Sequence, residues 1–154
     1  MEESKTIARP YAKAVFEIAL ANKQLNEWSK FLQACSQVVS NPEMANLISS
    51  PGVDVKALAK SIYELAIEIA NIKENKSFLS FVAVLAGNAR LRVVSEISNQ
   101  FDSKKRTEEG VVEVTITSAI DIGDESLSKI KQALKAKLNK SIEVIVEKDE
   151  QLIG

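Results

Sequence analysis

The sequence predicts a mainly α-helical protein, in which a six-helix bundle is followed by a small α/β domain. Apolar residues recur at helical spacing through residues 6–105. From residue 112 the spacing changes to alternation, which is typical of a strand. A charged stretch at residues 102–110 separates the two patterns and is predicted to be a linker. Domains are therefore expected at residues 1–105 and 111–154.

Capping and turn residues delimit the predicted helices of the first domain. Pro10 is tolerated in the first turn of the first helix. Asn41-Pro42 ends the second helix, because the residue before a proline disfavours α geometry. Asp54 is suited to the N-cap or first turn of the fourth helix, and Gly87 lies where the fifth one stops. The expected helices span residues 6–21, 25–40, 43–49, 54–70, 75–86 and 91–105.

The second domain is predicted to be a strand, an amphipathic helix and a second strand. Val112, Val114 and Ile116 alternate with polar residues, and a second alternating run starts at Ile142. Between them a helix is expected to reach about residue 139. Its narrow apolar stripe consists of Leu127, Ile130, Leu134 and Leu138. This order is a βαβ unit with a right-handed crossover. Because one helix and two strands form a marginal core, the unit is expected to be an incomplete α/β domain.

Composition indicates a soluble globular protein rather than a membrane or nucleic-acid-binding one. Of 154 residues, 45% are hydrophobic and 27% charged, and the net charge is −1. The sequence contains no run of about 18 apolar residues, so no membrane-spanning helix is predicted. The single cysteine excludes an intramolecular disulfide and fits a reducing compartment. The N-terminal residues lack the apolar core of a signal peptide, so a bacterial cytoplasmic protein is the simplest interpretation.

Catalytic and cofactor sites are not predicted. The chain has no histidine, which excludes histidine-based triads, general bases and metal sites. The five glycines form no phosphate-binding loop. Cys35 stands among apolar residues and is predicted to be a small core residue. We therefore expect no enzyme activity, no metal and no cofactor.

Two helices carry more apolar surface than the outside of a small domain requires. On an α-helix with 100° of rotation per residue, the apolar side chains of residues 11–21 cover an arc of about 260° around the helix axis. From residue 78 to 89 no side chain is charged. Each helix either runs through the centre of the bundle or keeps a face for a partner. Because both cannot easily be enclosed, a groove between them that accepts an amphipathic helix accounts for both surpluses.

Two basic clusters leave other interpretations open. Residues 104–106 close the sixth helix, where cations favour the helix C-terminus. The second-domain helix carries lysines that are either solvated or a docking surface for an acidic or amphipathic partner. They are Lys129, Lys131, Lys135, Lys137 and Lys140. The alternative function is a helical RNA-binding or transcription-factor domain, although no aromatic residue interleaves with the lysines.

Four segments resemble one protein family, and they occur in the family's order. Residues 8–14 read Ala-Arg-Pro-Tyr-Ala-Lys-Ala, and residues 88–91 read Asn-Ala-Arg-Leu. Residues 112–119 read Val-Glu-Val-Thr-Ile-Thr-Ser-Ala, and residues 149–154 follow the pattern Asp-x-x-Leu-Ile-Gly. On these segments the chain resembles the delta subunit of bacterial F-type ATP synthases. The mitochondrial equivalent is the oligomycin-sensitivity-conferring protein.

The resemblance implies a non-catalytic subunit of the peripheral stalk. Such a stator links the catalytic head to the b subunits, so that proton-driven rotor torque is coupled to ATP synthesis. It implies a peripheral location at the cytoplasmic face of the bacterial membrane, with no nucleic-acid partner and only indirect membrane contact. In the family a further strand and helix follow the Leu-Ile-Gly-Gly turn, so the second domain is expected to be truncated.

The resemblance also implies two partner sites. In the family, helices 1 and 5 bind the N-terminal helix of an alpha subunit, and the second domain binds the C-terminus of the b subunit. Lys131 and Lys135 are the candidate b contacts here. Carried over by position, the alpha-binding residues are Tyr11, Ala14, Val15, Ile18, Phe81, Val84, Leu85 and Asn88.

Overall fold

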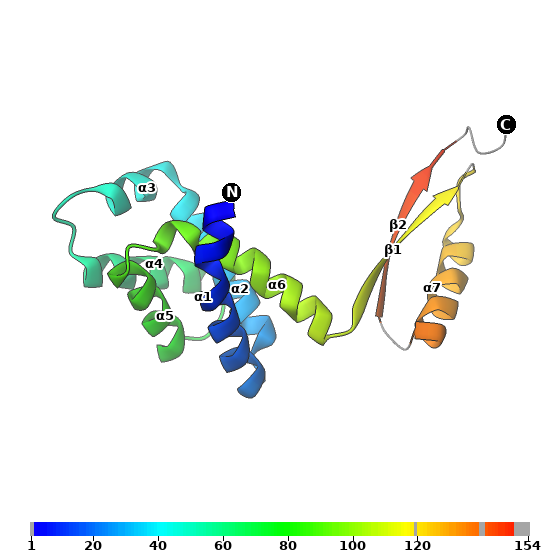
Figure 1. The fold of residues 1–154 in the computed structure, drawn as a ribbon, viewed down its shortest axis with the longest axis horizontal. Helices are drawn as coiled ribbons and strands as arrows, with labels where there is room; N and C mark the ends of the chain where they lie inside the picture. Colours follow the sequence, from blue (N-terminus) through cyan, green and yellow to red (C-terminus); the bar gives the residue numbers. More distant parts are fainter. Residues whose placement is uncertain (1, 119, 139–140, 150–154) are drawn as a thin grey trace. The chain divides into compact units, whose positions relative to one another are not determined.

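A computed structural model describes residues 2–118, 120–138 and 141–149. The chain divides into two compact units, Met1–Ser103 and Lys104–Gly154. The first is helical, and the second combines two parallel strands with a helix, as Figure 1 shows. The prediction of a mainly helical chain with a small parallel sheet is therefore confirmed. The elements are α1 (Glu2–Ala21), α2 (Leu25–Ser40), α3 (Pro42–Ser49), α4 (Val55–Ala70), α5 (Lys76–Gly87), the 3-10 turn η1 (Leu91–Val93), α6 (Val94–Glu108), β1 (Val111–Ser118), α7 (Asp124–Leu138) and β2 (Ser141–Lys148).

Side-chain caps begin three helices of the first unit. Asp54 Oδ1 accepts hydrogen bonds from the backbone N–H groups of Lys56 and Ala57, at 3.0 and 3.2 Å. This confirms Asp54 as the N-cap of α4. Asn41 caps α3 and Asn75 caps α5 in the same way. Each cap satisfies donors that have no partner within the helix, which fixes where the helix starts.

Helix α1 begins earlier than the sequence predicted. It starts at Glu2 rather than at residue 6, so that Pro10 lies inside the helix and not in its first turn. Pro10 has no N–H to donate to the carbonyl of Thr6, and its ring is exposed. Glu2 and Glu3 occupy the first turn, where carboxylates interact favourably with the helix dipole. The extra turn therefore forms despite the missing hydrogen bond.

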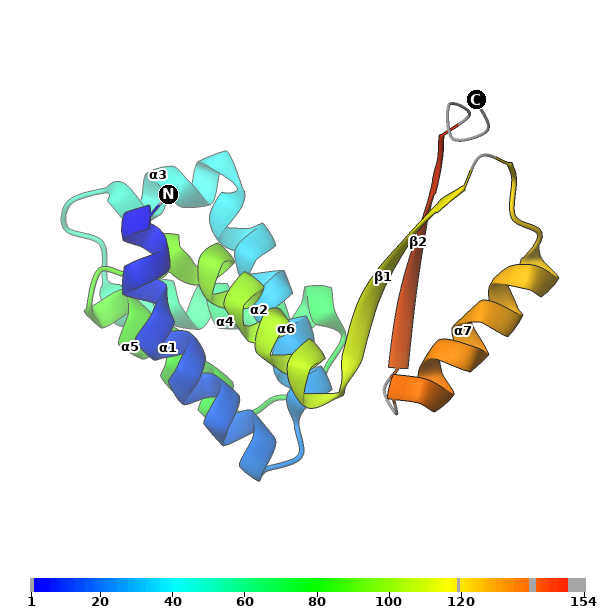
Figure 2. The ribbon, with the colours of Figure 1, turned by 45° about the vertical axis from the view of Figure 1, so that its right-hand side comes forward.

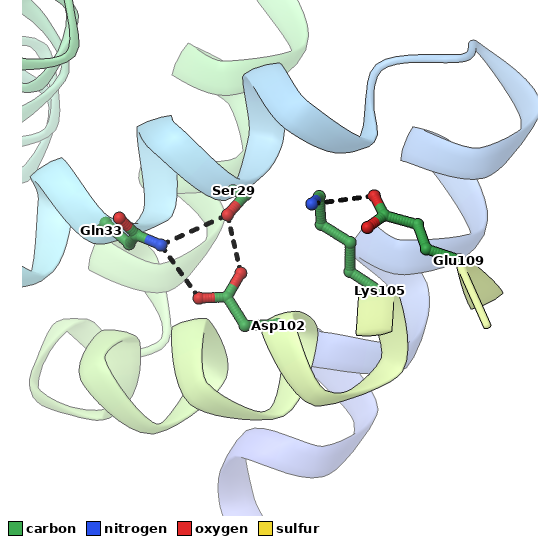
Figure 3. A network of polar contacts seen from close by, with 5 residues as sticks. All are labelled: Ser29, Gln33, Asp102, Lys105 and Glu109. Carbon is green, nitrogen blue, oxygen red and sulfur yellow. Dashed lines mark hydrogen bonds and ion pairs between the residues drawn. The ribbon is translucent and has the colours of Figure 1, made fainter. Parts of the chain in front are cut away.

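The predicted linker at residues 102–110 is mostly helical. Helix α6 continues to Glu108, and Lys105 forms an ion pair with Glu109 at 2.8 Å, which Figure 3 shows. Lysine, arginine and glutamate are good helix formers, and cations favour the last turn of a helix. A charged stretch between two units can therefore form a continuous helix. The prediction of a linker did not take this helix propensity into account.

Aromatic side chains form the centre of the first unit. The ring of Phe31 stacks on Phe78 with centroids 4.5 Å apart, and Trp28 meets Phe78 edge-on at the same distance. These three side chains are at most 1% exposed. Tyr63 packs beside Phe31, and its hydroxyl accepts a hydrogen bond from the backbone N–H of Asn75 at 3.0 Å. The cluster joins α2, α4 and α5, and it thereby fixes the position of α5.

A polar cluster joins α2 to α6, as Figure 3 shows. The Asp102 carboxylate accepts hydrogen bonds from the Ser29 hydroxyl at 2.7 Å and from the Gln33 amide at 3.0 Å. Gln33 also donates to Ser29 Oγ at 3.3 Å. Ser29 is buried and Asp102 is half-buried, so that water competes weakly for these bonds. They hold α6 against α2.

The change Asp102→Ala should destabilise the first unit by about 1–3 kcal/mol, because it leaves the buried Ser29 hydroxyl without its acceptor. Urea unfolding followed through Trp28, the sole tryptophan, measures this loss. Asp102→Asn keeps an acceptor and should lose less. Asn99→Ala, at an exposed position of the same helix, is the control. An Asp102→Ala variant as stable as this control would show that the cluster adds nothing.

The second unit has a small core. Strands β1 and β2 pair in parallel, with Val114 opposite Val144. Helix α7 packs against β2 through half-buried apolar residues, and Figure 2 shows the helix on one side of the two strands. These residues are Leu127, Ile130 and Leu134. Among the described side chains after residue 104, Ile142 alone is buried.

Parts of three predicted features lie outside the described residues. They are the last residue of the segment 112–119, the end of the second-domain helix at residue 139, and residues 150–154 of the Asp-x-x-Leu-Ile-Gly segment. The side chain of Leu138 also lies outside them. The structure therefore places only the first parts of these features.

Candidate functional site

An open groove of about 380 Å³ lies between α1 and α5. Side chains of both helices form its walls, and Trp28 of α2 contributes to it. Its lining residues are Tyr11, Ala14, Val15, Ile18, Trp28, Lys76, Ser77, Ser80, Phe81 and Val84. Most of them are apolar and none is acidic. Such a groove suits the apolar face of a partner helix.

Helix α1 uses two different faces. Ala8, Ala12 and Ala19 are fully buried, and Val15 is 3% exposed. These small residues recur at helical spacing and let α1 pack closely on the bundle. Ile18, three residues after Val15, is 45% exposed, and both side chains line the groove. Of the two explanations for the apolar surplus of this helix, the structure favours an open face over complete enclosure.

Helix α5 divides its apolar residues in the same way. Val84 is 52% exposed and lines the groove, whereas Leu85 is fully buried. Leu85 shares the inner face with Phe78 and Val82, which lie seven and three residues earlier. Val84 and Leu85 point about 100° apart, and this rotation places Leu85 in the core and outside the groove lining. The prediction that Leu85 lines the groove is therefore wrong, and Leu85 is a core residue.

A hydrogen bond joins the C-cap residue of α5 to Tyr11 of α1, which lines the groove. The amide nitrogen of Asn88 donates to the Tyr11 hydroxyl at 3.2 Å. This bond brings the C-terminal end of α5 to Tyr11, so that the first turn of α5 lies toward Ile18. Asn88, which was predicted to line the groove, is not among its lining residues but bonds to Tyr11, which is one of them. The predicted residues that line it are Tyr11, Ala14, Val15, Ile18, Phe81 and Val84.

Sequence reasoning missed three lining residues and left a fourth undecided. Lys76, Ser77 and Ser80 line the groove, and the helical spacing of Ser77, Ser80 and Val84 was the signal that could have found them. Trp28, which sequence reasoning left between groove and core, belongs to both. It is 1% exposed, yet it lines the groove and meets the ring of Phe81 at 5.8 Å.

The indole Nε1 of Trp28 is a buried donor without an acceptor among the described residues. Leaving such a donor unpaired costs about 1–3 kcal/mol, which is unusual for a side chain at the centre of a fold.

The described residues around the groove offer no acid–base or metal chemistry. Cys35 is 1% exposed, and burial raises the pKa of its thiol, which keeps it protonated and unreactive at neutral pH. Within the described residues, no group of three or more histidine, cysteine or acidic side chains could hold a metal ion. The lining of the groove itself is mostly apolar, which suits the binding of a partner helix.

A second groove of about 480 Å³ lies between α2, α3 and α4. It is larger, but polar side chains interrupt it. Its lining residues are Gln37, Val38, Asn41, Glu43, Met44, Leu47, Leu65 and Ile69. We assign the candidate site to the α1/α5 groove, because two helices with surplus apolar surface meet there and no acid interrupts them.

The candidate b-contact residues lie on α7. Lys131 and Lys135 are exposed and four residues apart, so they share one face of the helix. Lys129 pairs with Glu125 at 3.5 Å. Within the described part of the second unit, no carboxylate lies within 4.0 Å of Lys131 or Lys135. The two charges are thus available to an acidic partner.

Comparison with known proteins identifies the family. The family model of the ATP synthase delta (OSCP) subunit matches residues 7–154. A Nitrosococcus oceani protein named ATP synthase subunit delta is 36% identical over 154 residues, which are 100% of this chain and 84% of the relative. Proteins of the same name from Alkalilimnicola ehrlichii and Chromobacterium violaceum are 37% and 32% identical, with the same coverage.

The relatives confirm the resemblance that the four sequence segments indicated. They match along the whole chain, so both units are covered. They give no support to the alternative of an RNA-binding or transcription-factor domain. The chain therefore belongs to the ATP synthase delta (OSCP) subunit family.

Proposed function

We propose that the α1/α5 groove binds the N-terminal helix of the ATP synthase alpha subunit. Family membership makes this chain a non-catalytic, structural subunit of the peripheral stalk of an F-type ATP synthase. It acts within a membrane-associated complex, where other ATP synthase subunits are its partners. None of the described helices has the length and apolar character to cross a membrane. We place the subunit at the cytoplasmic face of the membrane.

The open groove is the observation that carries this proposal. Ile18 and Val84 are about half exposed on neighbouring helices, which leaves apolar surface in contact with water. Covering that surface with the apolar face of a third helix is favourable, because it removes the surface from water. Trp28 and Phe81 add aromatic contacts, which often dominate the energy of an interface.

The mechanism that follows is mechanical. The peripheral stalk keeps the catalytic head from turning with the rotor, so that rotor torque drives conformational change in the head. A contact that bears load must dissociate slowly, and slow dissociation is the usual source of high affinity between proteins. An apolar groove on a well-packed bundle meets this need without an active site.

The second contact that we propose is with the b subunit, through α7. The support is a pair of exposed lysines on one face of this helix, Lys131 and Lys135, neither of which has a carboxylate of the described residues within 4.0 Å. Charge reversal at both positions, Lys131→Glu with Lys135→Glu, should reduce capture of the b subunit from detergent-solubilised membranes. Binding of the alpha subunit should stay unchanged. If the double variant captures the b subunit as well as the native chain does, this contact lies elsewhere.

A peptide titration tests the groove. The peptide copies about two dozen N-terminal residues of the alpha subunit from the same organism and is added to the full chain. Trp28 is the sole tryptophan and lines the groove, so its emission should change in a saturable way with one peptide per chain. Circular dichroism should show added helix. No change in emission and no heat of binding up to about 100 µM peptide would contradict the proposal.

A further inference from the structure

We propose that the end of the groove at the first turn of α5 is a carboxylate-binding subsite. It is formed by Lys76, Ser77 and Ser80, and it binds an Asp or Glu side chain of the partner helix. The inference rests on the proposed function of the groove and adds to it the chemistry of the partner. It also implies that the partner helix docks in one direction only.

The subsite contains a free charge and free hydroxyl groups. Lys76 is exposed in the first turn of α5, and no described carboxylate lies within 4.0 Å of its ammonium group. Ser77 and Ser80 line the same end, and within the described part of the chain their hydroxyls make no hydrogen bond. Because the groove lining contains no acid, nothing inside it neutralises Lys76.

The indole of Trp28 is not part of the subsite, although its side chain also lines the groove. Its Nε1 is buried and has no acceptor among the described residues. Because this atom has almost no surface open to solvent, a carboxylate in the groove would contact the Lys76 ammonium group and the serine hydroxyls instead.

The two ends of the groove differ in charge. At the subsite, the start of α5 adds the positive end of the helix dipole to the charge of Lys76. At the other end, Asn88 and Tyr11 are neutral and already hydrogen-bonded to each other. A partner helix with one suitably placed carboxylate therefore gains an ion pair in one orientation and loses it in the reverse one.

An amphipathic helix fits these observations better than a polyanion does. The groove holds one cation between apolar walls, whereas nucleic acids and anionic lipid surfaces are bound by several cations together. The remaining walls are apolar side chains such as Ile18, Phe81 and Val84. The occupant is therefore a helix whose apolar face carries an acidic residue at one end.

The test is a double-mutant cycle with the alpha-subunit peptide and the full chain. Lys76→Gln removes the charge and keeps most of the side-chain length. Lys56→Gln is the matched control, because Lys56 is an exposed lysine in the first turn of α4 and does not line the groove. Each Asp or Glu of the peptide is changed in turn to its amide.

Lys76→Gln should weaken peptide binding by about 3- to 10-fold, and Lys56→Gln by less than about 2-fold. One of the peptides with an Asp or Glu changed to its amide should bind the native chain about as weakly as the unchanged peptide binds Lys76→Gln. The affinity of that amide peptide should not fall further when Lys76 is changed to Gln. Raising the salt concentration should weaken binding to the native chain more than binding to Lys76→Gln.

If Lys76→Gln binds like Lys56→Gln, or if no peptide acid couples to Lys76, the subsite is wrong. The groove assignment survives in that case, because the native chain still binds the peptide. If the native chain binds no peptide, the groove assignment and the subsite both fail.

Discussion

The change Ala14→Asp should weaken binding of the alpha-subunit peptide by about 100-fold or more. Ala14 lines the groove, so a bound helix would bury the new carboxylate against apolar side chains. Desolvating an unpaired charge costs several kcal/mol, and each 1.4 kcal/mol corresponds to about a factor of ten in affinity. Titration of the full-length variant with the peptide, monitored by Trp28 fluorescence and calorimetry, measures this loss.

The same variant should remain folded. Ala14 is exposed in the free subunit, so the aspartate points into water and costs only about 0.7 kcal/mol in helix propensity. Ala45→Asp, at an exposed position of α3 outside the groove lining, is the matched control and should bind the peptide normally. If Ala14→Asp unfolds the first unit, this face of α1 belongs to the core. If the variant folds and binds as tightly as the native chain, the alpha subunit binds elsewhere.

Local sequence patterns predicted the elements well, because the signals for helices and strands are local. The N-cap at Asp54 depends on a few neighbouring residues, and so does the change from helical spacing of apolar residues to their alternation with polar ones. The apolar surplus of α1 and α5 predicted the groove for the same reason. Carrying positions over from a family was less accurate. Leu85 was assigned to the groove beside Val84, although its side chain is 0% exposed and belongs to the core.

Long-range contacts could not be predicted from these patterns. Nothing near Ser29 in the sequence indicates that its hydroxyl donates to Asp102, which lies 73 residues later. The charged composition around Asp102 indicated a linker, whereas contacts with α2 and good helix propensity favour a continuous α6. Trp28 likewise could be placed between groove and core only once the positions of α1, α2 and α5 were known.

The change Phe31→Ala should cause a large loss of stability, about 3–5 kcal/mol for the first unit. Phe31 is completely buried, with 0% of its surface exposed to solvent. Its ring contacts those of Trp28, Tyr63 and Phe78. Truncation removes the stacked contact and leaves a cavity that this rigid centre fills poorly. Urea unfolding followed by circular dichroism should show a midpoint lower by about 2 M.

Ile69→Ala is the control for this loss, because Ile69 is an apolar residue of α4 that is 49% exposed, and it should cost less than about 1 kcal/mol. A loss below about 1 kcal/mol for Phe31→Ala itself would mean that the aromatic cluster is not the centre of the core. In conditions where it is still folded, Phe31→Ala should bind the alpha-subunit peptide only modestly more weakly, because Phe31 does not line the groove. Ala14→Asp should show the opposite pattern, with stability kept and binding lost. Opposite patterns in the two variants would establish that α1 and α5 bury one face for the fold and keep the other for a partner.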